Sequence, residues 1–136
     1  MKFAVKGIKP APQGSKKLTR YGAMIEACPR HKIWRKAVAK AAEATGFPMT
    51  DRPVFVQITF LFERRKSDLD SNGRPKANAP LYKSTAPDLD KLVRSTLDAI
   101  TGILIKNDSQ VVNLICCKQY ANEGELPGAL INVNPL

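Results

Sequence analysis

The chain has 136 residues, of which 43% are hydrophobic, and a formal net charge of +10. This length supports one domain with a buried core and is too short for two. No apolar run reaches the roughly 18 residues that a membrane span needs. The N-terminus lacks the apolar stretch of a signal peptide, so we expect a single cytoplasmic domain over residues 1–136.

The positive charge is concentrated in the first forty residues. This part holds eleven Lys or Arg residues and one acid, Glu26, so it carries the whole net charge of the chain. Bases and acids balance over residues 41–136. Such a one-sided excess favours a polyanionic partner over a merely solubilising surface, but it does not choose among DNA, RNA and a membrane surface.

The first half of the chain is expected to alternate between strands and a helix. Residues 3–8 form a short strand, residues 9–20 a loop rich in Pro, Gly and Lys, and residues 21–27 a second extended piece. Residues 53–63 alternate in polarity as a strand that is buried largely on one face.

A helix is predicted over residues 29–45, where apolar side chains such as Ile33 and Trp34 recur at helical spacing. Its outward face carries basic residues. Trp34 lies on the apolar face and is assigned to the core. His31 is the only histidine in the chain, which excludes a multi-histidine metal site, and we expect it on the surface.

Residues 63–87 show no periodicity and are too many for an ordinary connection, so they form either a functional loop or a partly disordered segment. This long loop is basic. Its stretch from Asp68 to Gly73 matches only the opening half of a calcium-binding loop, and Ala79 stands where the bidentate Glu would be needed. We therefore interpret that stretch as a polar turn.

The second half contains a helix and two closing strands. Pro87 opens the helix, one apolar stripe follows it, and Gly102 ends it. Residues 111–120 and 129–133 are the predicted strands. The whole pattern predicts an α+β fold, in which a small mixed or antiparallel sheet packs with two main helices.

Three aspartates around the second helix are the candidate catalytic group, because carboxylates are the ligands that Mg²⁺ prefers. Asp88 and Asp90 are about 200° apart on a regular helix. They converge only if the chain is extended at Asp88 and helical from about Asp90. Asp108 follows the helix, and a strand from Gln110 would run back antiparallel to it. Its approach to the other two acids therefore depends on tertiary geometry.

Each of these residues also has an ordinary structural interpretation. Asp88 or Asp90 alone could be a helix cap. Arg94 lies four residues from both Asp90 and Asp98, which suits two weak surface salt bridges. The functional alternative places Arg94 beside the metal ligands, where it would contact the scissile phosphate.

Three short motifs resemble the signature of the RusA family of Holliday junction resolvases: PDLDKLVR at 87–94, LDAITG at 97–102 and DSQVV at 108–112. The resemblance covers about the central third of the chain and extends weakly to the basic helix around Trp34. Members of this family are small endodeoxyribonucleases, often carried by phages. The resemblance implies a RusA-like fold and a homodimer that cuts four-way DNA junctions by paired symmetric nicks. It also implies Mg²⁺ as the cofactor, with Mn²⁺ as a substitute, and a bacterial host cell if the gene is phage-borne.

The resemblance also assigns roles to individual residues. Asp88, Asp90 and Asp108 match the acids that bind Mg²⁺. Arg94 stands where the best-known member has an essential lysine, a role that Lys91 could share. Apart from the resemblance, we expect Asp98 and Gln110 to be supporting residues, with Asp98, two helical turns after Asp90, orienting Arg94.

Basic residues outside this group are expected to contact the DNA backbone. They are Lys16, Lys17, Arg20, Arg30, Lys32, Lys36, Arg64, Arg65, Lys66 and Lys83. Tyr21 and Tyr82 are candidates for stacking on unpaired bases. Two alternatives stay open: a noncatalytic basic DNA-binding protein, and a nuclease that acts on other branched nucleic acids.

Overall fold

The computed structural model describes residues 1–13, 16–18, 24–26 and 30–136. Its strands and helices in chain order are β1 (Lys2–Lys6), β2 (Lys16–Leu18), β3 (Met24–Glu26), α1 (Arg30–Ala44), β4 (Val54–Phe62), α2 (Leu89–Ile100), β5 (Val111–Tyr120) and β6 (Gly128–Pro135). Two short 3₁₀ turns, η1 (Lys66–Asp68) and η2 (Asp108–Gln110), complete the described elements.

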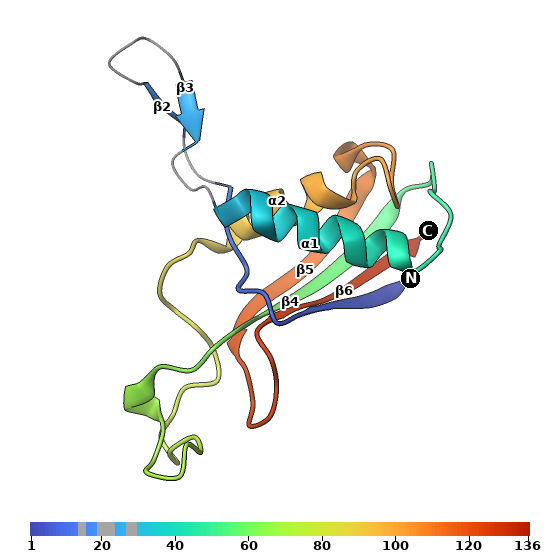
Figure 1. Cartoon of the computed structure of the whole chain (residues 1–136). Helices are drawn as coiled ribbons and strands as arrows, with labels where there is room; N and C mark the ends of the chain where they lie inside the picture. Colours follow the sequence, from blue (N-terminus) through green and yellow to red (C-terminus); the bar gives the residue numbers. More distant parts are fainter. Residues whose placement is uncertain (14–15, 19–23, 27–29) are drawn as a thin grey trace.

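A mixed four-stranded sheet forms the centre of the fold, in the order β1-β6-β4-β5. β4 and β5 run parallel, whereas β6 is antiparallel to both β1 and β4. Both helices lie on one face of this sheet (Figure 1). The α+β class predicted from the sequence is confirmed, and the sheet is the mixed one of the two kinds expected.

β2 and β3 pair as a separate two-stranded sheet. β3 lies within the extended piece predicted at 21–27, but β2 occupies a stretch that was expected to be loop. The pattern of three residues was too short to reveal a strand. Figure 1 shows β2 and β3 beyond the N-terminal end of α1, away from the four-stranded sheet.

The alternating residues of β4 build the floor of the core. Val54, Val56, Ile58 and Phe60 are buried beneath the helices, whereas Gln57 is exposed on the opposite face. β-branched and aromatic side chains favour extended backbone because they pack well on a pleated surface. The predicted strand at 53–63 is therefore confirmed to within one residue at each end.

α1 presents His31, Trp34, Val38 and Ala42 to the core. The expectation that His31 lies on the surface was wrong, since only 5% of it is exposed. Ile33, which was assigned to the apolar face, is 62% exposed. The rest of the predicted stripe is correct, since Trp34, Val38 and Ala42 are buried, and the difference is limited to the first turn of the helix.

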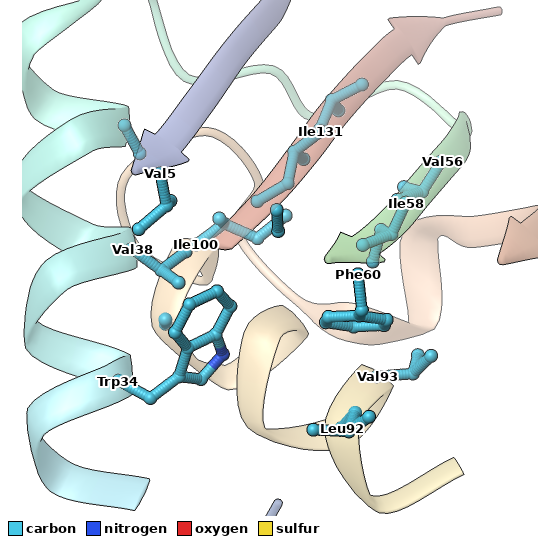
Figure 2. Packing of buried hydrophobic residues seen from close by; sticks show 14 of the residues in the cluster. Val5, Trp34, Val38, Val56, Ile58, Phe60, Leu92, Val93, Ile100 and Ile131 are labelled. Carbon is cyan, nitrogen blue, oxygen red and sulfur yellow. The ribbon is translucent and has the colours of Figure 1, made fainter. Parts of the chain in front are cut away.

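α2 packs against α1 and the sheet through Leu92, Val93, Thr96 and Ile100. Trp34 of α1 is completely buried between these elements, as predicted, and its indole Nε1 donates a hydrogen bond to Thr96 Oγ1 at 3.1 Å. Figure 2 shows Trp34 lying between Val38 and the residues of α2, with Phe60 of β4 nearby. The two helices are therefore joined by a buried polar contact as well as by apolar packing.

α2 is the crossover between the parallel strands β4 and β5. Parallel neighbours require such a connection because the chain must return to the end of the sheet where the first strand began. α2 therefore starts near the ends of β4 and β5 and finishes near their beginnings, antiparallel to β5. At about 1.5 Å per residue, its twelve residues span about 18 Å.

The segment before α2 contains a polar turn but no long regular element. Leu69 and Pro75 form an isolated bridge. Asp70 Oδ1 accepts hydrogen bonds from the backbone N–H groups of Asn72 (2.9 Å) and Arg74 (3.0 Å). The predicted polar turn at 68–73 is confirmed. None of the helices in the described residues is long and apolar enough to cross a membrane.

Candidate functional site

The first two aspartates lie at the start of α2. Asp88 is the N-cap residue, with an extended backbone (φ −68°, ψ 137°), and the helix begins at Leu89. Asp90 follows in the first turn and is exposed. The chain therefore changes from extended to helical between the two acids, which is the condition that the sequence set for their side chains to converge.

The Asp88 carboxylate does not cap its helix. It accepts no hydrogen bond from the first turn, although it occupies the position where Asp usually does so. It lies 3.6 Å from Lys91 Nζ, and the Asp88 side chain is 66% exposed. An exposed ion pair of this kind contributes little to stability. The Asp88 oxygens are therefore accessible to a ligand from solvent.

Hydrogen bonds fix this end of α2 to its surroundings. Lys118, on the helix-facing side of β5, donates from Nζ to the carbonyl oxygens of Thr85 and Pro87, both at 2.8 Å. The backbone N–H of Gln13 donates to the Lys91 carbonyl oxygen at 3.1 Å. Pro87 immediately precedes Asp88, so the backbone that carries the acid is held in place by β5.

The third aspartate, Asp108, is exposed on η2, directly before β5. A capping box shapes this turn: Asn107 Oδ1 accepts from the Ser109 N–H, and Gln110 Oε1 accepts from the Asn107 N–H. Gln110 Nε2 donates in turn to the carbonyl oxygens of Thr50 (3.0 Å) and Arg52 (2.8 Å). Gln110 thereby fixes the backbone on which Asp108 stands.

Within one chain, Asp108 is separated from the other two acids. Lys118, which contacts the start of α2, is seven residues beyond Val111, and that stretch of strand spans about 23 Å. Among the described residues, no three His, Cys, Asp or Glu side chains come close enough to hold one metal ion. One chain therefore brings together Asp88 and Asp90 and places Asp108 at the far end of α2.

Arg94 is exposed on α2, one turn after Asp90 and on the same side of the helix. The two salt bridges considered for it, with Asp90 and with Asp98, are absent from the ion pairs of the described residues. No ion pair among the described residues therefore supports the expected orientation of Arg94 by Asp98. The Arg94 guanidinium is available to an anion, whereas Lys91 is already paired with Asp88.

The basic residues assigned to DNA differ in what they contact. Arg30, Lys32 and Lys36 are exposed along α1, and Lys66 is exposed in η1. Arg65 pairs with Asp68 at 2.9 Å, and this hydrogen-bonded carboxylate raises the pKa of Arg65. Arg20 lies outside the described residues, as does Tyr21, and the side chains of Lys16 and Lys17 are likewise not described.

Arg64 has a structural use that the sequence did not reveal. Its guanidinium donates to the carbonyl oxygens of Ala121 (3.0 Å) and Pro80 (2.7 Å) and lies 5.7 Å from the centre of the Tyr120 ring. These contacts tie the two ends of the basic loop to the end of β5. Two of its five N–H donors, on Nε and Nη1, are therefore used within the protein.

Lys83 is partly enclosed by aromatic rings. Its ammonium group lies 5.4 Å from the centre of the Phe62 ring and 5.5 Å from that of Tyr120, and it donates to Thr85 Oγ1 at 2.9 Å. Partial burial lowers the pKa of Lys83, and repulsion from Lys9 and Arg65 adds to this effect. The neighbouring Tyr82 is 60% exposed, so it stays a candidate for base stacking.

Two positioning residues were missed or understood only in part. Lys118 was not singled out, although its place in the alternation of β5 puts it on the helix-facing side together with Cys116 and Tyr120. A lysine at an inward position of a predicted strand was the available signal. Gln110 was named as a supporting residue, but its hydrogen bonds to Thr50 and Arg52 could not be foreseen because those partners are far away in the sequence.

The chain matches the model of a known protein family. The model of the family described as "Endodeoxyribonuclease RusA" matches residues 7–133. This range includes all three aspartates, both helices and most of the four-stranded sheet. No curated protein sequence matches the chain significantly.

Proposed function

The chain belongs to the RusA family of endodeoxyribonucleases, hydrolases that act on branched DNA, and from this premise we propose that it resolves four-way junctions as a Mg²⁺-dependent homodimer that makes paired symmetric nicks. The observation that carries the proposal is the pair of acids at the start of α2. Asp88 is exposed and accepts no capping hydrogen bond, and Asp90 stands beside it in the first turn.

The chemistry of these side chains fits a divalent cation of the Mg²⁺ type, with Mn²⁺ as a substitute, because carboxylate oxygens are its preferred ligands. When bound, such an ion would make a water more acidic and offset negative charge on the phosphate. The unpaired Arg94 would face the same phosphate and stabilise charge that develops during cleavage. Lys91, drawn to Asp88 at 3.6 Å, would keep this carboxylate oriented.

A second copy of the chain would complete the acid set. Residues 81–83 lie along the end of β5, through hydrogen bonds from the Lys83 N–H to Lys118 O and from the Tyr120 N–H to Leu81 O. In the four-stranded sheet, β5 has no strand on its other side, so its edge over residues 111–117 can accept a partner. Val112 and Leu114 there are 62% and 40% exposed, which suits an interface.

Two-fold pairing of these edges would make the two β5 strands antiparallel. The beginning of one β5 would then lie beside the end of the other, where Lys118 contacts Pro87. Asp108 of the partner subunit would approach Asp88 and Asp90. Each dimer would have two such sites, as symmetric cleavage of two strands requires.

The direct test is cleavage of a synthetic four-way junction in Mg²⁺ and in EDTA. We expect paired symmetric nicks from the native chain in Mg²⁺ and none in EDTA. Asp90→Asn should bind the junction at least as well as the native chain, because it loses a negative charge, and should not cut it. Glu43→Gln, at an exposed acid of α1, is the matched control and should cut normally. Equal cutting by Asp90→Asn would contradict the assignment.

Shared sites are tested by mixing two inactive variants. Co-expressed Asp90→Asn and Asp108→Asn chains, each with a different tag, are purified as the heterodimer. One of its sites then combines native Asp88 and Asp90 from one chain with native Asp108 from the other. We expect single nicks from the heterodimer and no cutting by either homodimer. An inactive heterodimer would show that each site draws all its acids from one chain.

A further inference from the structure

A positively charged pocket of about 330 Å³ lies beside the start of the basic loop. Lys9, Lys66 and Lys83 line it together with Arg64, and the Phe62 ring forms part of its wall. Glu63 is the one acid among its lining residues. Cationic side chains from three separate parts of the chain therefore converge on one concavity.

The lysines of this pocket have no counter-charge in the described part of the chain. Lys9, Lys66 and Lys83 take part in none of the ion pairs there, and neither does Glu63. The Arg64 guanidinium is turned to the carbonyl oxygens of Ala121 and Pro80. Three lysines thus line a common space that has a single acid among its lining residues.

Lys83 is partly buried beside two aromatic rings. Its ammonium group lies between the Phe62 and Tyr120 rings and is partly removed from water. Burial and the nearby charges of Lys9 and Arg65 lower the pKa of Lys83, which means that its charged form is disfavoured where it stands. An anion in the pocket would reverse that effect.

The pocket is close to the acids of α2. Asp88 is five positions after Lys83, so their Cα atoms are at most about 18 Å apart. Lys118 holds the intervening Thr85 and Pro87, and Lys83 itself donates to Thr85 Oγ1. The distance between pocket and acids is therefore fixed by hydrogen bonds.

We propose that this pocket binds a phosphate of the substrate DNA a few nucleotides from the one that is cut, and that it thereby positions the strand against Asp88 and Asp90. The inference rests on the proposed function, because it takes these acids as the place of cleavage. Lys66 and Lys83 are positioning residues in this scheme. They hold the strand in register and do not touch the reacting atoms.

The test removes one negative charge at a time from the DNA. A set of junctions carries a single uncharged methylphosphonate at successive positions near the cut, and the dissociation constant of each is measured in EDTA. We expect one position outside the scissile phosphate to weaken binding to the native chain by about tenfold, the size of a charge-assisted contact. In Lys83→Gln, a methylphosphonate at that same position should weaken binding less than twofold, while methylphosphonates at the other positions keep their effects.

Lys76→Gln is the matched control, since Lys76 is an exposed lysine of the same loop that does not line the pocket. It should keep the native response at every position. Lys66→Gln should lose the response to a methylphosphonate at the same position as Lys83→Gln does, so the conclusion does not depend on one variant. Each pocket variant should also lower the slope of log Kd against log salt concentration by about one.

Two results would contradict the proposed role of the pocket without contradicting the proposed nuclease activity. In one, native protein cuts the junction and Lys83→Gln responds to every methylphosphonate as the native chain does. In the other, inorganic phosphate raises the pKa of Lys83, measured by NMR of its side chain, but no DNA position depends on Lys83. The pocket would then take a free anion. Failure of cleavage by the native chain would instead contradict the proposed function itself.

Discussion

The carboxylate of Asp88 stands where a helix cap is normally found and does not act as one. A capping aspartate accepts a hydrogen bond from the first turn, and its loss destabilises a protein by about 1 kcal/mol. Here the side chain is turned to solvent and to Lys91. The ordinary structural explanation for an acid at this position is therefore not realised.

We predict that Asp88→Ala changes the free energy of unfolding by less than about 0.5 kcal/mol, because no hydrogen bond is lost. The same substitution should abolish junction cleavage. Asn107→Ala is the matched comparison, since Asn107 does accept a capping hydrogen bond from Ser109. It should lower stability by about 1 kcal/mol in urea denaturation. A similar loss of unfolding free energy in Asp88→Ala would show that Asp88 caps the helix.

Single side chains were predictable from the sequence only where their neighbours are close along the chain. Trp34 was assigned to the core because it lies on the apolar face of its helix. The change from extended to helical chain between Asp88 and Asp90 was expected because Pro87 marks a helix boundary. Ile33 and His31 were misplaced because both lie at helical spacing from residues that pack in or against the core. Ile33 is four residues before Ala37 and His31 three before Trp34, so spacing alone does not tell which of them joins the core. The contacts of Arg64 are backbone carbonyls at Pro80 and Ala121, which no pattern of residue types records.

At the scale of elements, the turn between α2 and β5 depends on one amide group. Gln110 Oε1 accepts from the N–H groups of Lys106 and Asn107, and Gln110 Nε2 donates to Thr50 O and Arg52 O. This amide joins the turn to the chain before β4. The position of Asp108 follows from it.

We predict that Gln110→Glu lowers the free energy of unfolding by about 2 kcal/mol, because two donors are lost and a carboxylate oxygen is placed against two carbonyl oxygens. It should also reduce cleavage, since the turn that carries Asp108 shifts. Urea denaturation and junction cleavage measure the two effects. Ser109→Ala, a neighbouring change at an exposed side chain, should leave both unchanged. Native stability in Gln110→Glu would mean that the turn is held by other contacts.

The regular elements follow closely from their periodicity, and the long loop does not. The boundaries of β5 agree with the prediction, and those of α2 and β4 nearly so, because α2 and β4 have continuous apolar stripes and β5 is a run of mostly apolar residues. Residues 81–83 lie along β5 although they show no strand pattern. Their backbone hydrogen bonds depend on the neighbouring strand and not on their own side chains.

At the scale of the whole molecule, the open edge of β5 is the feature that favours pairing with a second chain. An unpaired strand edge with exposed apolar side chains tends to pair with another chain. Leu114 lies at the middle of the free stretch, 111–117, so a two-fold axis there would place it close to its symmetry mate.

We predict that Leu114→Lys weakens the dimer at least tenfold, because two like charges would meet near the axis. Analytical ultracentrifugation measures the dissociation constant of the dimer, and cleavage should fall together with the dimer fraction. Leu130→Lys is the control, since Leu130 is a similarly exposed leucine on β6, which is paired on both sides. A dimer that Leu114→Lys leaves intact would exclude pairing through this edge.

The sequence predicted the fold class but not the order of the strands. The order β1-β6-β4-β5 joins the last strand to the first, and pairings between distant parts of a chain leave no local pattern. The place of Asp108 depends on the parallel pairing of β4 and β5, so it could not be known without the tertiary structure. The family resemblance predicted the three acids as metal ligands without indicating that one chain keeps them apart.

The separation of the acids along one chain has a geometric consequence for the proposed dimer. Asp88 and Asp108 lie at opposite ends of α2, about as far apart as Lys118 is from Val111 along β5. In the proposed dimer, two-fold symmetry would turn this separation into the spacing between the two reaction centres. The span between the two cleaved bonds would therefore follow the length of the β5 edge.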